Sequence, residues 1–189
     1  MEILNIEKEK AINAYRVGSD EQKQVLELLF GVETLKTKTV MDRVKTFEDA
    51  LKELKPFHPL VKEYKALCKA DVTPNLIAYS RLCVITAAMN EGWRPRFVKE
   101  EYRYFPYFYL YTNEEISRMS EEEKSSVVFR SNSSAYAYGG VAYACAYNDS
   151  VYVANVGSRL AFKTEELAEY AGKQFTKLYA DYLLNTNNA

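Results

Sequence analysis

The chain has 189 residues, of which 48% are hydrophobic and 27% charged, and its formal net charge is -1. This composition is typical of a globular domain and argues against wholesale disorder and against a membrane protein. The 16 tyrosines, set against one tryptophan and one histidine, favour a contact surface over acid–base catalysis, because tyrosine combines apolar area with a polar tip.

Charge is divided unevenly along the chain. Residues 1–99 carry 17 Lys and Arg against 14 Asp and Glu, whereas residues 100–189 carry 8 against 12. Most of the tyrosines lie in this second, acidic half. The distribution weakens any interpretation in which the tyrosine-rich half binds a phosphate backbone.

The three cysteines, Cys68, Cys83 and Cys145, form no C-x-x-C pair and have no histidine at a metal-ligand spacing. We therefore expect buried free thiols in a reducing compartment. The N-terminal segment lacks the pattern of a signal peptide, and no later run approaches the roughly 20 apolar residues of a membrane span. These features predict residence in the cytoplasm without a membrane partner.

The first elements in chain order are two amphipathic helices. Residues 6–17 and 20–30 carry periodic apolar positions, and Gly18 and Gly31 are suited to end them. We expect residues 1–31 to form a helical hairpin extension and residues 32–189 to form a single α+β domain.

Helical patterns continue through the first half of the second region. Residues 32–44 fit either a strand or a helical turn, whereas Thr46 is suited to cap a helix over 47–54 and Pro59 to begin another that ends at Cys68. Residues 75–90 are apolar nearly all round, which predicts the central core helix.

The spacing of apolar residues changes after Gly92 from a helical to a strand-like pattern. Residues 93–97 contain a proline that favours an extended chain, and residues 102–111 read as a strand in which Pro106 belongs on an edge or at a bulge. We expect the phenylalanine and leucine side chains of this strand to be buried and its tyrosines to be half exposed. The buried set is Phe105, Phe108 and Leu110, and the exposed set is Tyr102, Tyr104, Tyr107, Tyr109 and Tyr111.

Polar caps and small residues follow. Thr112 and Ser120 each precede acidic residues that favour a short helix, and residues 127–129 read as a short strand. Residues 135–147 alternate small and aromatic side chains, which predicts a hairpin with a return strand at 151–153. Strict alternation places Val141, Tyr143, Cys145 and Tyr147 on one face and Ala142, Ala144 and Ala146 on the other.

The last elements are a predicted strand at 159–162 and a long helix that begins after Thr164 and covers the sheet. The chain is therefore predicted to have an α+β fold, with a helical N-terminal half packed on a small antiparallel, tyrosine-rich sheet and a C-terminal covering helix.

Several segments carry distinctive sequences: residues 45–50 (KTFEDA), 90–95 (NEGWRP), 157–163 (GSRLAFK) and 166–175 (ELAEYAGKQF). They resemble a recurring family of hypothetical proteins in phages and prophages of gut Bacteroidales-type bacteria. The resemblance covers most of the chain from about residue 40 and implies a phage-related role, in the cytoplasm of the bacterial host or in association with the virion. It assigns no activity to any residue.

The sequence contains few residues that are suited to catalysis. His58 is the sole histidine and precedes Pro59, where a capping role is expected, and no second imidazole is present for a triad. Gly139 and Gly140 are not followed by the Lys-Ser/Thr of a phosphate loop, and the acids at 121–123 suit the first turn of a helix. We expect no catalytic residue, cofactor or metal site.

The tyrosine-rich sheet is the candidate site. Packing in a core or against a second subunit is the simpler interpretation of these aromatic strands, and stacking of single-stranded nucleic acid is the alternative. We therefore predict a non-enzymatic interaction or assembly protein that binds a protein partner or self-associates. The alternative hypothesis is a single-stranded nucleic-acid-binding protein. The candidate residues are Trp93, Arg94, Arg96, Lys99, Arg103, Tyr104, Tyr107, Tyr109, Tyr136, Tyr138, Tyr143 and Tyr147.

Overall fold

A computed structural model describes residues 6–35, 39–96, 98, 101–129, 140–149 and 157–184 of the chain. The chain forms two compact units, Met1–Thr39 and Val40–Ala189. The second unit contains the sheet and the large hydrophobic core, and it therefore holds the candidate site.

The N-terminal unit is made of α1 (Lys8–Val17), α2 (Asp20–Phe30) and α3 (Val32–Leu35). A capping box at Ser19 begins α2, and Gly31 ends it with a positive φ of 75° that glycine adopts without strain. The short helix α3 contacts both longer helices and buries Leu35. The unit thus extends beyond the expected hairpin of residues 1–31.

Four helices begin the second unit: α4 (Val40–Arg43), α5 (Phe47–Leu54), α6 (Pro59–Leu67) and α7 (Pro74–Met89). A capping box at Thr46 starts α5, as its sequence predicts. Helix α7 packs against α5 and α6 on one side and α11 (Thr176–Leu183) on another, and most of its last ten residues are buried. The predicted central core helix is confirmed.

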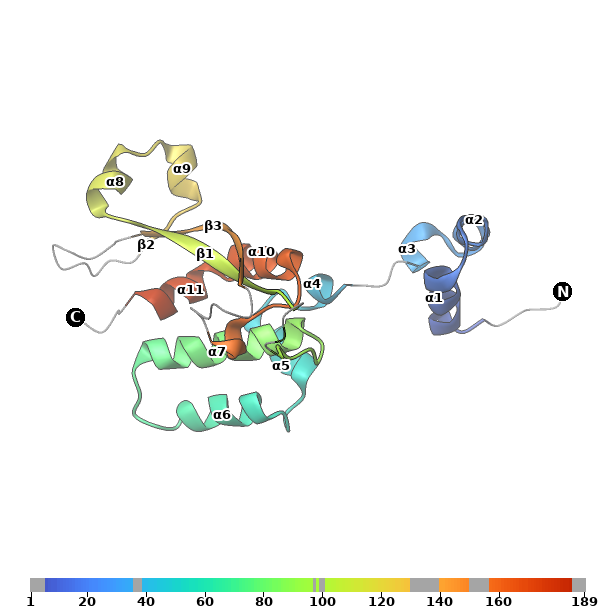
Figure 1. Cartoon of the computed structure of the whole chain (residues 1–189), viewed down its shortest axis with the longest axis horizontal. Helices are drawn as coiled ribbons and strands as arrows, with labels where there is room; N and C mark the ends of the chain where they lie inside the picture. The colour runs from blue at the N-terminus through green and yellow to red at the C-terminus, as the bar shows by residue number, and fades with distance from the viewer. Residues whose placement is uncertain are drawn as a thin grey trace. The chain divides into compact units, whose positions relative to one another are not determined.

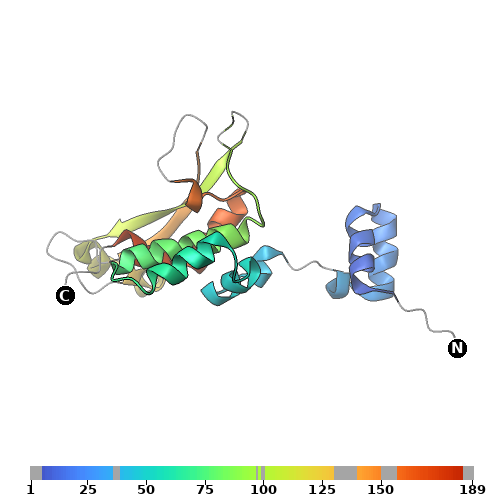
Figure 2. The ribbon, with the colours of Figure 1, turned by 90° about the horizontal axis from the view of Figure 1, so that it is seen from below.

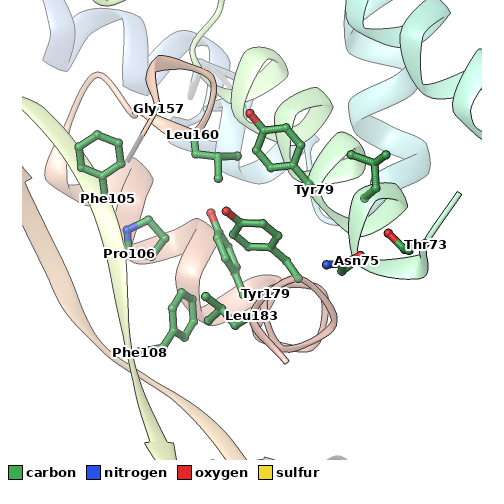
Figure 3. A pocket seen from close by; sticks show the side chains of 12 residues that line it. Thr73, Asn75, Tyr79, Phe105, Pro106, Phe108, Gly157, Leu160, Tyr179 and Leu183 are labelled. Carbon is green, nitrogen blue, oxygen red and sulfur yellow. The ribbon is translucent and has the colours of Figure 1, made fainter. Parts of the chain in front are cut away.

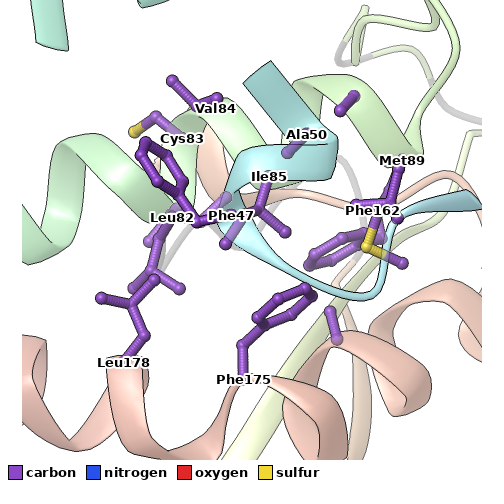
Figure 4. Packing of buried hydrophobic residues seen from close by; sticks show 14 of the residues in the cluster. Phe47, Ala50, Leu82, Cys83, Val84, Ile85, Met89, Phe162, Phe175 and Leu178 are labelled. Atoms are coloured by element: carbon purple, nitrogen blue, oxygen red, sulfur yellow. The ribbon is translucent and has the colours of Figure 1, made fainter. Parts of the chain in front are cut away.

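The core lies between these helices and the C-terminal elements. Figure 4 shows Leu82 and Ile85 of α7 among side chains from α5 and from the C-terminal segment, including Phe47 and Phe162. Asn90, at the end of α7, joins the same two regions, since its Nδ2 donates to Ala161 O at 2.8 Å and its Oδ1 accepts from Lys163 N at 3.0 Å. Residues far apart in the sequence are therefore held together at one point.

Among the described residues, the sheet has three strands in the order β1-β3-β2, formed by β1 (Arg103–Tyr111), β2 (Val128–Phe129) and β3 (Gly140–Asp149). Both pairings are antiparallel. Helices α10 (Glu165–Gln174) and α11 contact the sheet, and α11 lies between the sheet and α7 (Figures 1 and 2). The predicted α+β class, with a helical N-terminal half and C-terminal helices on a small antiparallel sheet, is confirmed.

A β-bulge changes the orientation of β3. Tyr107 pairs with Cys145, but the next residue of β1, Phe108, pairs with Tyr143, so Ala144 has no partner on β1. The extra residue turns Tyr143 to the face covered by helices, where it lies against Gly172 of α10. The expected all-alanine face is wrong, because strict alternation does not continue through a bulge.

Two further expectations about the C-terminal region are wrong. Residues 158–160 form a 3₁₀ helix, η1 (Ser158–Leu160), and only Phe162 bridges to Tyr104 of β1. The expected single terminal helix is broken at Phe175, where the backbone (φ -114°, ψ 23°) leaves the helical range before α11 begins. The Thr176 hydroxyl donates to the carbonyl oxygens of Gly172 and Lys173 at this point. The expected return strand at 151–153 lies outside the described residues.

Two short helices connect β1 to β2: α8 (Asn113–Arg118) and α9 (Glu121–Ser125). Each begins with a capping box, at Thr112 and Ser120, as the sequence predicts. Ile116 of α8 packs against Gly140 at the start of β3, where an added Cβ would lie 2.9 Å from the Ile116 Cδ1 atom. Helix α8 is therefore anchored at one end of the sheet (Figure 1).

Candidate protein-contact surface

One face of the sheet presents tyrosines to solvent. Side chains alternate along a strand, so Tyr107, Tyr109 and Tyr111 of β1 share a face. Tyr107 is 58% exposed, Tyr109 57% and Tyr147 of β3 49%. We call these four residues, Tyr107, Tyr109, Tyr111 and Tyr147, the tyrosine face.

The rings of the tyrosine face lie close to one another. The centroids of Tyr107 and Tyr147 are 6.5 Å apart across the two strands, and those of Tyr109 and Tyr111 are 6.1 Å apart along β1. Exposed Cys145 lies on the same face, since it pairs directly with Tyr107 and stands two residues before Tyr147 on β3. The arrangement is a nearly continuous aromatic surface with polar hydroxyl tips, a composition that is enriched at protein interfaces.

Two other candidate tyrosines face the interior of the unit. The Tyr143 ring packs on α10, with Lys173 Nζ 5.5 Å from its centroid, and burial raises the pKa of its hydroxyl to about 12. Tyr104 packs against the main hydrophobic core. Tyr136 and Tyr138 lie outside the described residues. The structure thus separates the candidate tyrosines into an exposed group and a packing group.

The candidate cations are not gathered on the tyrosine face. Arg103 is 1% exposed and belongs to the interior. Arg96 is exposed, but its guanidinium pairs with Glu101, with Nε 3.2 Å from the carboxylate. Trp93 is half-buried in the turn after α7, where its backbone N–H donates to the Asn90 carbonyl oxygen. Arg94 beside it is exposed. Lys99 lies outside the described residues.

Acidic side chains lie near one end of the tyrosine face. Gly140 pairs with Tyr111, and Ile116 covers this position, so α8 stands at the end of the face. Glu114 of α8 and Glu121 and Glu122 of α9 are exposed there. Glu114 pairs with Arg118 and Glu121 with Lys124, but residues 113–125 carry five glutamates against these two cations. This end of the sheet therefore repels a phosphate backbone and attracts a basic group.

The remaining candidates for chemistry have structural roles. His58 caps α6, where its Nδ1 accepts from the Leu60 N–H at 3.3 Å, and burial, aided by the charge of Arg94, lowers its pKa. Cys83 is buried, and burial raises its pKa to about 11, but Cys68 and Cys145 are exposed, so the expectation of three buried thiols is wrong for two of them.

The described residues form neither a metal-binding cluster nor a membrane-spanning helix. Within the part of the chain that the structure describes, no group of three or more His, Cys, Asp or Glu side chains is placed to hold a metal ion. Among these same residues no helix has the length and apolar character needed to cross a membrane.

Comparison of the chain with protein-family models, with curated proteins and with solved structures found no match. Any functional assignment must therefore come from the site itself. The alternation of tyrosines in β1 is the sequence signal for the exposed group, and it also identifies Tyr111 as a member. Cys145 was not a candidate, because its thiol was expected to be buried, although alternation places it on the face of Tyr147.

Proposed function

We propose that the chain is a non-enzymatic interaction or assembly protein whose contact surface is the tyrosine face. The observation that carries this proposal is the difference between the two faces of the sheet: helices α10 and α11 cover one, whereas three tyrosines on the other are about half exposed. Exposed aromatic groups of this kind mark interaction sites. A phage-related setting rests on the resemblance of the sequence segments alone.

A second copy of the chain is the first partner to test. The tyrosine face carries no charged side chain among its four members, so two such faces can meet without burying an unpaired charge. Tyrosine loses little side-chain entropy when it is immobilised and its hydroxyl can bond across the contact. Self-association through this face is therefore physically favourable.

Single-stranded nucleic acid is the alternative ligand. The rings offer stacking platforms for bases, which favours this reading. Binding of a strand also requires cations along its path, but Arg103 is buried, Arg96 is paired with Glu101, and exposed glutamates lie near one end of the face. The charges of the described residues thus favour a protein partner.

The proposal is tested by replacing Tyr107, Tyr109 and Tyr147 with serine. Sedimentation velocity and native mass spectrometry of the full chain should show a concentration-dependent oligomer whose dissociation constant rises at least about 30-fold in the triple variant, because central aromatic residues dominate interface energies. The matched control is Phe57→Ser, which removes a ring that is 82% exposed between α5 and α6. It should leave the oligomer unchanged.

A strictly monomeric wild-type protein at about 100 µM would reject self-association through this face. A fluorescence titration with short single-stranded DNA and RNA at low salt separates the alternative. Quenching of the tyrosine signal with a steep salt dependence, lost in the triple variant, would favour the nucleic-acid reading over the protein reading.

A further inference from the structure

A cavity of about 640 Å³ lies in the second unit, away from the helix layer formed by α5 and α6. Its walls come from the first turns of α7, from residues 105–108 of β1, from η1 and from α11. Figure 3 shows side chains from all four elements directed at the same hollow. A cavity of this size is in the range that holds small-molecule ligands.

Aromatic rings dominate the lining. Phe105 and Phe108 come from β1, Tyr79 from α7 and Tyr179 and Tyr182 from α11. The rings already pack in pairs, with centroids 4.7 Å apart for Phe108 and Tyr179 and 5.6 Å apart for Tyr79 and Tyr182. Both pairs are tilted, with 35° between the ring planes, and a flat ligand can pack against such rings.

The cavity carries no charge. None of the described residues that line it is Asp, Glu, Lys, Arg or His. Burial raises the pKa of Tyr79 to about 12 and raises that of Tyr179 as well, so both hydroxyls stay protonated near neutral pH. A charged ligand would lose its hydration here without gaining an ion pair, which disfavours it strongly.

One polar group in the wall lacks a partner. Asn75, in the first turn of α7, lines the cavity, and its Oδ1 is buried without a hydrogen bond from any described residue. A buried unpaired acceptor is costly. Figure 3 shows Asn75 at the cavity wall, and rotation of its amide by 180° exchanges the oxygen and the nitrogen, so the side chain can present an acceptor to a donor on the ligand.

We propose that this cavity binds a small, uncharged, planar aromatic molecule that donates one hydrogen bond, through an O–H or N–H group, to the side chain of Asn75. The rings supply the contact area, the absence of charged lining selects against ions, and the unpaired amide selects for a donor. This site is independent of the tyrosine face, so either proposal can fail without the other.

Indole is the probe for the full-length chain, because it is planar, uncharged and carries one N–H donor. Chemical-shift titration by NMR should give a dissociation constant of about 10⁻⁴ to 10⁻³ M, as expected for a ligand of this size. Benzofuran, which has the same shape without the donor, should bind about 3- to 10-fold more weakly. Indole-5-carboxylate, which adds a charge, should show no binding at the same concentrations.

Two variants locate the site. Asn75→Ala should weaken indole about 3- to 10-fold and leave benzofuran unchanged. Leu76→Trp fills the cavity from a partly exposed position on α7 and should weaken both probes at least 10-fold. Its matched control is Leu29→Trp on α2, an exposed leucine of the N-terminal unit, which should bind indole as the wild type does.

Three results would overturn the proposal: equal affinity for indole and indole-5-carboxylate, indole binding that survives Leu76→Trp, or an equal loss of both probes in Asn75→Ala. The amide spectrum of each variant, recorded before titration, shows that the fold is intact. Should Leu76→Trp not fold, Leu183→Trp at the α11 wall of the cavity makes the same test.

Discussion

Gly172, in α10, lies in close contact with the sheet. A Cβ atom built at this position would lie 2.4 Å from the Tyr143 ring and 2.8 Å from the Pro106 Cβ atom. Both neighbours are held, because Pro106 is part of β1 and Tyr143 lies in β3 just beyond the bulge. The absence of a side chain therefore sets the spacing between α10 and the sheet.

We expect Gly172→Ala to lower the free energy of unfolding by about 1 to 3 kcal/mol, measured by urea denaturation. The gain in helix propensity, about 1 kcal/mol for alanine over glycine, is smaller than the cost of moving the aromatic ring. The overlap predicts a positive coupling with Tyr143→Ala, so the double variant should lose less stability than the two single changes added together. If the stability losses of the two single variants simply add in the double variant, contact with the Tyr143 ring is not what excludes a side chain at position 172.

The helices α8 and α9 both begin with a capping box. The side chains of Glu115 and Glu123 accept hydrogen bonds from the backbone N–H groups of Thr112 and Ser120, at 2.7 and 2.8 Å. These bonds lower the pKa of both carboxyl groups from the usual value of 4.5. The two helix starts, which hold the acidic end of the tyrosine face, are therefore acid-sensitive.

Acid is expected to destabilise the starts of α8 and α9, because the pKa values of Glu115 and Glu123 are lowered in the folded state. A carboxyl group that is more acidic in the folded state stabilises that state fully above its unfolded pKa, and this contribution is lost as the pH falls through the folded value. We expect the amide signals of Thr112 and Ser120 to titrate together below pH 4.5, measured by NMR between pH 6 and pH 3. Glu115→Gln and Glu123→Gln keep an acceptor but remove the ionisation, so each should abolish the titration at its own helix. Persistence of the shift in these variants would contradict the assignment.

Helix starts were predictable because their signals are local. Thr46, Thr112 and Ser120 each stand three residues before an acid that completes the capping box, and all three boxes are present. The apolar character of α7 is likewise a property of its own sequence. Short-range hydrogen bonding and burial therefore account for most of the helical part of the fold.

The faces of β3 and the end of α10 were not predictable, because they depend on distant partners. The alternation of residues 141–147 is compatible with several registers, and only pairing with β1 places the extra residue at Ala144. The break at Phe175 arises where α10, packed on β1 and β3, gives way to α11, packed on α7. Of the candidate site, the exposure of Tyr107 and Tyr109 followed from alternation, whereas the burial of Arg103 and the packing of Tyr143 on α10 did not.

At the scale of the whole molecule, the two units differ in how much they bury. The main hydrophobic core is formed entirely by residues from Val40 onwards. In the described part of the N-terminal unit only Ala11 and Leu35 are buried hydrophobic residues, and α2 has none. A unit shorter than about 40 residues with so small a core is not expected to be stable in isolation.

We expect a peptide of residues 1–39 to show little helix and no cooperative melting by circular dichroism. Residues 40–189 alone should keep a Tm within about 2 °C of that of the full chain, because they contain the complete core. A fall of more than about 5 °C would show that the N-terminal unit stabilises the second unit, and cooperative melting of the peptide would show that the N-terminal unit folds alone.

The apolar surface of α7 also bears on how the chain is made. Helix α7 ends at Met89, but α11, which covers one of its sides, begins only at Thr176. At ordinary rates of translation, this interval lasts on the order of ten seconds. Helices α5 and α6 precede α7 and pack against it, so they can cover part of its apolar surface while the rest of the chain is still being synthesised. The order of elements along the chain thus limits how long the apolar helix α7 is without any partner.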